Sequence, residues 1–511
     1  MTVWIWTGKD ERLLRLESDA AIVKWGARTA SSESWHSVSS SDAVIDYCLT
    51  KPIDEEKYKQ AWVLNPNAYL SSRWTAEEKQ RIWRQWGVNR KRTPLASVRR
   101  FRVSVVHMDI AAIERIDGKY RSSGTVVSGS AANGRGGAAH YRQRENAKPP
   151  GEGRRKGASD FSGGLFTGVH AAVGRSHNTQ LAADDPMLRR IAQAAIRALY
   201  ALGLDIGEVE LELGGDGAID VRDAWPGLNN GEAEGEALAR FAAWHDAARA
   251  EDQRQLLIGA DPEFVLVTPS GRIAAASRFF GEGVGGAAGS DALRIGRRVL
   301  YPVAELRPAP AADPAALAAH LRRLLLRAAA KVSDPSLRWV AGAMPVPGLA
   351  LGGHIHISGA PLTTRLLRLL DSFAAIPLAL IEDPAGRARR PRYGSLGDYR
   401  LQPHGGFEYR TLPSWLVSPA AAKSAFALAL LCAREQWTLR HIPALDEQYI
   451  DAYFSGDRST LAGSLDGIAA ALTATASYKV LSRYIDPLLD AAKQGKTWDE
   501  HSDIRTKWRI T

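Results

Sequence analysis

The chain has 511 residues, of which 45% are hydrophobic and 24% are charged. This composition excludes disordered and collagen-like classes, and the length predicts about two to four folding units. With only Cys48 and Cys432, neither a disulfide framework nor a cysteine-rich metal site can form. No run reaches the roughly 18 apolar residues of a membrane span, and the first residues turn charged at Lys9 before a signal-peptide core is complete. We therefore expect a soluble, cytoplasmic protein with no membrane partner.

Basic residues are in excess, with 66 Lys and Arg against 56 Asp and Glu, which gives a net charge of +10. The excess is local, because residues 73–103 carry ten basic side chains and two acidic ones, with Trp74, Trp83 and Trp86 between them. Tryptophans among arginines are able to stack nucleic-acid bases, but at helical spacing they more often bury one face of a helix. We favour the buried helix face and keep a basic nucleic-acid-binding protein as an alternative function.

The first half of the chain predicts a long loop followed by an α+β region. Residues 122–157 are rich in Gly, Ser and Arg, which is typical of a flexible loop or lid. A helix is predicted from a cap at Asp184 or Asp185 to about Gly203, then strands at 209–213 and 218–221 and a helix at 234–251. The pattern changes after residue 252, so we expect two domains, at 1–252 and 253–511.

The second half alternates short β-branched runs with long Ala/Leu-rich helical patterns. Strands are predicted at 257–267, 272–277, 297–308, 350–358 and 405–413, and helices at 312–332, 361–382 and 418–442. This order predicts an α+β fold, with an antiparallel or mixed sheet and helices packed outside it.

Four of these strands carry polar residues two positions apart. Residues at this spacing point to the same face of a strand, and here each pair encloses an apolar residue such as Leu306, Ile355 or Tyr409. One such pair is usually a surface ion pair, but four on separate strands predict one polar sheet face. The pairs are Asp261 with Glu263, Glu305 with Arg307, His354 with His356, and Glu408 with Arg410.

Charged groups at this density need counterions. Carboxylates with an occasional imidazole suit Mg²⁺ or Mn²⁺, and arginines suit an anion, so the face is typical of a phosphate-handling site. Arg392, Arg400 and His404 lie in Gly-rich turns nearby in the sequence, where guanidinium groups could bind phosphate. The Gly-rich stretch 279–291 is a candidate lid or a plain loop.

The motifs GADPEF, ELRP, GGHIHI, RYGSLGDYR and HGGFEYRTLPSWL, over roughly residues 256–435, resemble the phage-type (type 2) carboxylate-amine ligases, amidoligases related to glutamine synthetase and glutamate–cysteine ligase. The resemblance implies a glutamine-synthetase-like curved antiparallel sheet, ATP with Mg²⁺ or Mn²⁺, and amide-bond formation through an acyl phosphate. It implies small-molecule or peptide carboxylate and amine substrates. By position, it implies metal ligands at Asp261, Glu263, Glu305 and Glu408, nucleotide or metal contacts at His354, His356, Arg392 and His404, and catalytic arginines at Arg307, Arg400 and Arg410, beside Glu408.

The first half carries a weaker resemblance, to the carboxy-terminal lobe of an ATP-grasp ligase. The segment ALYALGLDIGEVELELGGDGAIDVRDAWPGL would place Glu210 and Asp220 at metal-binding positions, and FRVSVV around Arg102 would supply a nucleotide-binding strand. Arg222 stands where that family has Asn, so the resemblance fits an active ATP-grasp-like site and a degenerate substrate-binding domain equally well. Two ligase folds in one chain would suggest two coupled amide-forming sites.

Other enzyme classes fit the residues less well. A metal-dependent hydrolase would bind Zn²⁺ through His354 and His356 but would leave the acids and arginines without a role. A guanidino kinase would share the sheet architecture, yet the motif strings do not resemble that branch. The sequence leaves the identity of the substrates and the oligomeric state open.

Overall fold

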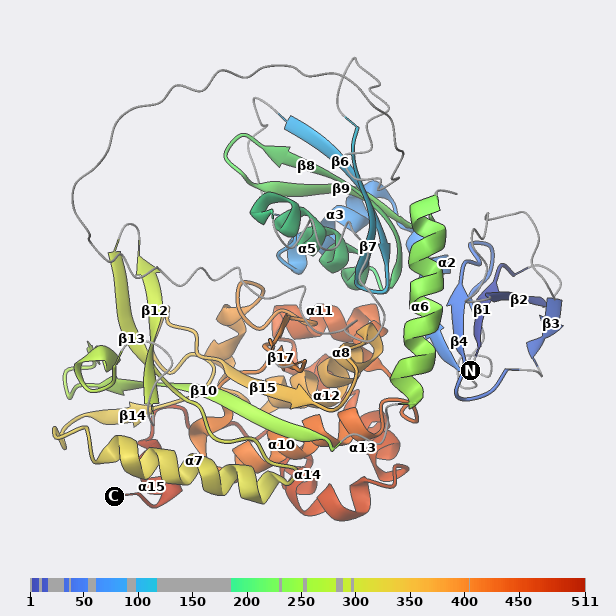
Figure 1. Ribbon diagram of the computed structural model, residues 1–511. Helices are drawn as coiled ribbons and strands as arrows, with labels where there is room; N and C mark the ends of the chain where they lie inside the picture. The colour runs from blue at the N-terminus through green and yellow to red at the C-terminus, as the bar shows by residue number, and fades with distance from the viewer. Residues whose placement is uncertain are drawn as a thin grey trace, which may run out of the picture.

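The computed structural model describes residues 2–8, 12–16, 32–35, 38–53, 61–89, 98–116, 185–228, 232–250, 255–281, 288–295, 298–403 and 405–510, arranged as Figure 1 shows. The predicted loop at 122–157, residues 282–287 of the candidate lid and the predicted boundary at residue 252 lie outside these ranges. Among the described residues, no helix combines the length and the apolar character that a membrane span requires.

A small mixed sheet opens the chain. It contains β1 (Val3–Trp6), β2 (Arg12–Leu16), β3 (Ser32–Ser34), β4 (Ala43–Asp46) and β5 (Trp62–Leu64) in the order β3-β2-β1-β4-β5. Strand β1 is antiparallel to β2 and parallel to β4. Helix α6 (Glu232–Ala250) packs Leu238 and Phe241 into the same core as Val3 and Ile5, and in Figure 1 it stands beside this sheet. No strand of this sheet was predicted from the sequence.

We expect the free energy of unfolding to depend on pH because of Asp46, at the end of β4. Its side chain is fully buried and accepts one hydrogen bond, from the Cys48 amide at 2.8 Å, and burial raises its pKa to about 7. The folded state therefore binds a proton that the unfolded state has released, and stability falls as the pH rises from about 4 to about 7, by about 4 kcal/mol from this group. We expect Asp46→Asn to raise the urea midpoint at pH 8 while changing it little at pH 4.5. An equal shift at both pH values would contradict this account.

A second, antiparallel sheet follows, in the order β7-β6-β8-β9. It consists of β6 (Val98–Val106), β7 (Asp109–Arg115), β8 (Ile206–Gly214) and β9 (Ile219–Pro226), packed against α2 (Ala68–Arg73), α3 (Ala76–Gln85) and α5 (Pro186–Ala201). The predicted strands at 209–213 and 218–221 and the predicted helices are confirmed. Asp185 caps α5 by accepting hydrogen bonds from Met187 and Leu188 amides, and Thr75 and Glu78 form a reciprocal capping box on α3.

The largest sheet is built around the long strand β10 (Leu257–Val267). Its strand order is β12-β13-β10-β15-β17-β16, with β11 (Ile273–Ala274) and β14 (Arg338–Val340) also paired to β10, and all its pairs are antiparallel. The other members are β12 (Ala288–Ile295), β13 (Arg298–Leu306), β15 (Gly353–Ser358), β16 (Tyr399–Leu401) and β17 (Phe407–Tyr409). The sequence predicted an antiparallel or mixed sheet, and the described pairs of this sheet are antiparallel.

The strand predicted at 272–277 is wrong for most of its length. Only Ile273 and Ala274 pair with β10, and the 3-10 turn η2 (Ala276–Arg278) follows directly. A short apolar run does not distinguish a strand from a tight turn, and Ala276 is buried here although it lies in the turn.

Helices cover one side of the large sheet. Helix α10 (Pro419–Arg434) packs against β10 and β15 and lies between α7 (Pro314–Ala329), which also packs against β13, and α14 (Tyr478–Lys493), in the helical layer that Figure 1 shows. The predicted helix at 361–382 is present as α8 (Thr364–Leu370), a π-helical turn η3 (Asp371–Ala375) and α9 (Ile376–Ile381). The remaining elements are η4 (Pro384–Arg389), η5 (Trp415–Val417), η6 (Pro443–Leu445), α11 (Glu447–Ser455), α12 (Arg458–Ala462), α13 (Leu465–Thr473) and α15 (Ile504–Trp508).

The two halves of the chain share one hydrophobic core. Ile191 and Leu199 of α5 belong to the same buried cluster as Ile258 of β10 and Phe426 of α10. Polar contacts cross the same boundary, since Tyr200 donates a hydrogen bond to Asp371 at 2.8 Å. Cys48 and Cys432 are both free and buried, so they form no disulfide. The division into domains at 1–252 and 253–511 stays a prediction.

Candidate active site on the polar face of the large sheet

Strand register places the predicted polar side chains on one face. Directly opposite residues in an antiparallel pair share a face, and Glu263 lies opposite Glu305, Asp261 opposite His354, and His356 opposite Glu408. The next strand adds Arg400, opposite Glu408. The spacing of two residues links these pairs, because Asp261 and Glu263 lie on β10 and His354 and His356 on β15.

The opposite face is apolar and holds the strands in place. Phe264, Leu306, Ile355 and Ile357 have no exposed side-chain area and belong to the main hydrophobic core. These residues alternate with the polar ones, so a slip of one residue in any strand would bury charges against the helices. The hydrophobic pattern therefore fixes the register, and the register assembles the polar face.

Three side chains from three strands converge into a candidate metal site. One ligand atom each from Asp261, His354 and Glu408 lies within 4.8 Å of the others. His354 Nδ1 lies 3.3 Å from Asp261 Oδ1 and 3.0 Å from Glu408 Oε1. All three atoms are buried, and within the described residues none of them makes a hydrogen bond of good geometry. Two carboxylates and an imidazole with unsatisfied atoms facing one another fit a divalent cation such as Mg²⁺ or Mn²⁺.

The pKa values at this site reflect burial and crowding. Burial would raise the pKa of Asp261, but His354 and His356 outweigh it and hold the pKa well below its usual range. Burial would lower the pKa of His354, yet Asp261 and Glu408 raise it well above its usual range. Burial and then the neighbouring Asp261 raise the pKa of Glu305 to about 9. Burial, together with the negative charge of Asp261, thus favours the neutral form of Glu305, as expected for a crowded carboxylate that has no added positive charge beside it.

Glu408 joins the candidate metal site to a cluster of cationic donors. Its Oε2 lies 2.5 Å from Arg400 Nη2 and accepts a hydrogen bond from Gln402 Nε2 at 2.9 Å, while Arg410 Nε lies 3.1 Å from Oε1. The Glu408 side chain is fully buried, whereas Arg400 and Arg410 keep part of their surface open to solvent. Two guanidinium groups beside a carboxylate centre can hold an anion next to a bound metal.

The other edge of the face carries Glu305, Arg307 and Glu263. Arg307 pairs with Glu305, and Glu263 Oε2 accepts a hydrogen bond from the Gly352 amide at 2.6 Å. Glu263 is further fixed by Ser414, whose hydroxyl donates to the Glu263 carbonyl at 2.6 Å. The face therefore has carboxylates in its centre and guanidinium groups at both edges.

The comparison with known proteins agrees with this layout. Residues 258–510 match the model of the family described as phage phiEco32-like COOH.NH2 ligase-type 2. The C-terminal half of the chain belongs to this family. All the residues of the polar face lie within that ligase-family half, which extends through the helices that pack beneath the sheet.

Solved structures give more distant likenesses. A bifunctional glutathione synthetase from Pasteurella multocida aligns at 11% identity and a TM-score of 0.33, over 52% of this chain and 52% of that one. Apo GmaS without ligand aligns at 14% identity and a TM-score of 0.29, over 49% of this chain and 72% of that one. The chain thus spans about half the length of the glutathione synthetase. No curated protein matches this chain.

One predicted residue of the ligase-family half, Arg392, lies apart from the observed cluster. Arg392 is exposed and lies over the Tyr393 ring, with 5.3 Å from its guanidinium carbon to the ring centroid. The prediction placed it with the other arginines because it lies near them in the sequence, but the turn after η4 directs it to the surface. His404 lies outside the described residues.

The predicted residues of the N-terminal half lie on the second sheet. Glu210 forms an ion pair with Arg102 at 2.8 Å, so each side chain is the counterion of the other. Asp220 lies opposite Glu212 and within 4.0 Å of Arg222, while Glu210 lies opposite Asp223. The β-bulge between Glu210 and Leu211 shifts this register. The structure thus does not bring Glu210 and Asp220 together as directly opposite residues, and their metal-binding role stays a prediction.

The basic segment 73–103 folds as the buried-face interpretation expected, over its described residues. Trp83 and Trp86, around the end of α3, are buried in the main core, which leaves neither ring free to stack on a base. Trp74 is half-buried. Residues 90–97 lie outside the described ranges.

Two residues that hold the polar face in place, Gln402 and Asp371, were not predicted from the sequence. Gln402 donates to Glu408 and could have been found, because it stands two residues after Arg400 and shares its face. Asp371 lies behind the sheet, where it accepts hydrogen bonds from Tyr409 at 2.6 Å and Tyr200 at 2.8 Å. Nothing in the sequence links these three residues, which are far apart along the chain.

Removing one candidate ligand gives a direct test of the metal site. We expect Asp261→Asn to weaken Mn²⁺ binding by about 10- to 100-fold, because a neutral amide replaces an anionic carboxylate among the three candidate ligands. Isothermal titration with Mn²⁺ measures the effect, and Asp313→Asn serves as the control, since Asp313 is an N-cap of α7 away from the face. Equal Mn²⁺ affinity in the two variants would contradict the assignment.

Proposed function

We propose that the protein is an ATP-dependent carboxylate-amine ligase whose active site is the polar face of the large sheet. The observation that carries the proposal is the cluster of Asp261, His354 and Glu408 directly beside Arg400 and Arg410. Membership of residues 258–510 in a COOH.NH2 ligase family supports the same reaction. We also propose that this sheet is curved in the way that a glutamine-synthetase-like fold implies.

Asp261, His354 and Glu408 would hold a divalent cation, Mg²⁺ or Mn²⁺, with Glu263 and Glu305 as further carboxylates. When bound, the cation would neutralise the phosphates of ATP and the charge that develops during transfer. His356 lies 3.0 Å from Asp261 and is placed to orient that carboxylate or to contact a phosphate. These carboxylate and imidazole ligands thus suit ATP that binds as its complex with Mg²⁺ or Mn²⁺.

The arginines supply the positive charge that the proposed reaction needs. A substrate carboxylate must attack the γ-phosphorus of ATP, and both are anions, so they repel each other in the absence of fixed positive charge. Arg400 and Arg410 are anchored by Glu408 and partly exposed, which positions them to bind the phosphoryl group, and Arg307 would bind a carboxylate at the other edge. Their orientation is set before the substrates arrive, so little reorganisation is required.

The proposed reaction has two steps. A carboxylate oxygen of the acid bonds to the γ-phosphorus, ADP leaves, and an acyl phosphate remains. The nitrogen of the amine then bonds to the acyl carbon, inorganic phosphate leaves with the attacking oxygen, and a carboxylate or imidazole of the face accepts the amine proton. The products are an amide, ADP and phosphate.

For the N-terminal half, we propose an ATP-grasp-like domain at 1–252 that binds substrate or carries a second ligase site. The antiparallel strands β6, β8 and β9 with Arg102, Glu210 and Asp220 support it. If a second site is active, Glu210→Ala combined with Asp220→Ala removes one of two condensation activities. An unchanged product pattern in that double variant would leave the N-terminal half without a catalytic role.

The experiment that tests the proposed function is ADP release from Mg²⁺-ATP by the purified protein, screened against pooled amino acids, small peptides and amines. Mass spectrometry of the same reactions detects condensed products. We expect ADP release that requires both an acid and an amine and that accompanies a product lighter by one water than their sum. The proposal fails if the protein does not bind Mg²⁺-ATP.

A further inference from the structure

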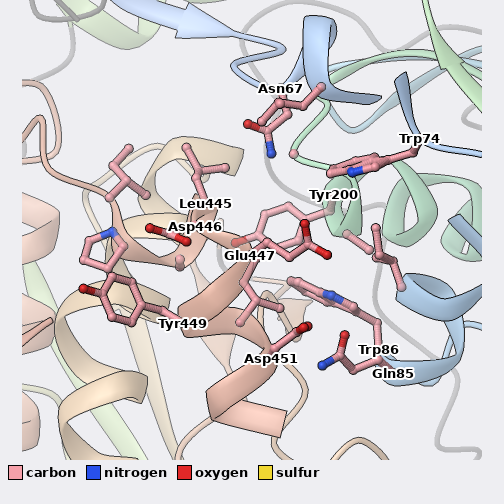
Figure 2. A pocket seen from close by; sticks show the side chains of 18 of the residues that line it. Asn67, Trp74, Gln85, Trp86, Tyr200, Leu445, Asp446, Glu447, Tyr449 and Asp451 are labelled. Carbon is pink, nitrogen blue, oxygen red and sulfur yellow. The ribbon is translucent and has the colours of Figure 1, made fainter. Parts of the chain in front are cut away.

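A pocket lies between the two halves of the chain, apart from the polar face. Its volume is about 540 Å³, which is within the usual size of small-molecule sites. One wall comes from α2, α3 and the end of α5, and the other from residues 441–451, which include η6 and the start of α11. Figure 2 shows side chains from both walls turned toward the same space.

Aromatic rings form much of the wall on the N-terminal side. Trp86 and Tyr200 are buried and meet edge to face, with ring centroids 5.8 Å apart, and Phe454 packs against Trp86 from behind. Trp74 is half-buried and lies across the pocket from Leu445 and Glu447 in Figure 2. Its indole is therefore the ring that a ligand would reach, and an indole face attracts cations more strongly than the rings of Tyr and Phe do.

Acidic side chains form the opposite rim. Asp446, Glu447 and Asp451 all line the pocket, and their carboxylates are labelled in Figure 2. Arg81 contacts Glu447 and lies 3.2 Å from Asp451, so one guanidinium serves two of the three carboxylates. Asp446 caps α11 by accepting a hydrogen bond from the Gln448 amide, and its charge is not matched by Arg81. His441 also lines this rim and adds positive charge only when it is protonated.

An apolar and aromatic cavity with excess negative charge at its rim is suited to one chemical class of ligand. We propose that this pocket binds an organic cation, an ammonium or guanidinium group carried on an apolar body. The cation would lie between the Trp74 ring and the Asp446 carboxylate, and the apolar body would fill the space beside Tyr200 and Leu445.

This site is independent of the proposed reaction. None of the residues that line the pocket belongs to the candidate metal site or to its arginines. The pocket does touch the catalytic sheet indirectly, because Tyr200 donates to Asp371, which also binds Tyr409 beside Glu408. Because the two sets of residues are separate, a ligand in the pocket would touch none of the proposed ATP-binding residues.

The test compares two probes that differ only in charge. Isothermal titration of the full-length protein with 2-phenylethylamine should give a Kd of about 1 mM or tighter, whereas 2-phenylethanol, its neutral counterpart, should bind at least about 10-fold more weakly. Asp446→Asn should weaken binding of the amine by about 3-fold or more while keeping the helix cap. Trp74→Leu should weaken it by about 5-fold.

The matched control is Asp457→Asn, which changes the equivalent N-cap of the next helix, α12, outside the pocket. It should leave the Kd of the amine unchanged. Equal affinity for the amine and the alcohol would overturn the proposal. So would the absence of amine binding up to about 10 mM, which is roughly tenfold the expected Kd. Equal amine affinity in Asp446→Asn and Asp457→Asn would overturn it as well. Because Asp261→Asn should not alter amine binding here, failure of the ligase proposal is distinguishable from failure of this one.

Discussion

Glu408→Gln should reduce acid- and amine-dependent ADP release by about 1,000-fold. Glutamine keeps the size of the side chain and can still accept hydrogen bonds, but it removes the negative charge that His354, Arg400 and Arg410 all face. It therefore deprives the candidate metal site of a ligand and leaves the guanidinium groups without their anchor. Steady-state ADP release with a coupled assay measures the loss, and thermal unfolding verifies that the variant is folded.

The control for this variant is Glu500→Gln. Glu500 is also a buried glutamate of the ligase-family half, but it accepts hydrogen bonds from the Met344 and Asp383 amides, away from the polar face. We expect its turnover to change by less than about twofold at a temperature where it is folded. A similar loss in both variants would mean that Glu408 acts only through stability.

Arg368→Met should lower the free energy of unfolding by about 3–5 kcal/mol. Arg368 of α8 pairs with Asp205 of the N-terminal half at 2.7 Å, and both side chains are buried. Without the guanidinium, Asp205 keeps a buried charge, although the Asn65 amide still donates to it at 2.7 Å. Urea unfolding followed by tryptophan fluorescence measures the change.

The double variant Arg368→Met with Asp205→Asn gives the matched comparison. Removing both charges should recover at least about half of the lost stability, because no unpaired ion stays buried. If the double variant is as unstable as the sum of the two single variants, the pair does not act as an ion pair that joins the two halves.

The polar face could be predicted from the sequence because strand geometry is simple. Residues two apart share a face, so the pairs around Pro262, Leu306, Ile355 and Tyr409 were enough to place eight polar side chains on one side of a sheet. The order of the strands was not predictable, since register between distant segments depends on packing. The close approach of Asp261, His354 and Glu408, which come from β10, β15 and β17, is a result of that order.

Residues in turns were harder to place. Arg392 and Arg400 lie eight residues apart in one Gly-rich segment, but only Arg400 enters a strand, so only its direction follows from the sheet. Tyr200, Asp371 and Tyr409 form a hydrogen-bonded chain across three distant segments, and no local pattern signals it. The same holds for the pocket at Trp74 and Asp446, which exists only because α3, α5 and α11 pack together.

The central claim is amide formation through an acyl phosphate on the polar face. The most direct measurement uses the acid identified by the ADP-release screen, labelled with ¹⁸O in its carboxylate, and mass spectrometry of the inorganic phosphate. The mechanism predicts that one labelled oxygen moves from the acid to phosphate for each amide formed. Label that appears in AMP, or that stays wholly in the amide and the unreacted acid, would contradict it.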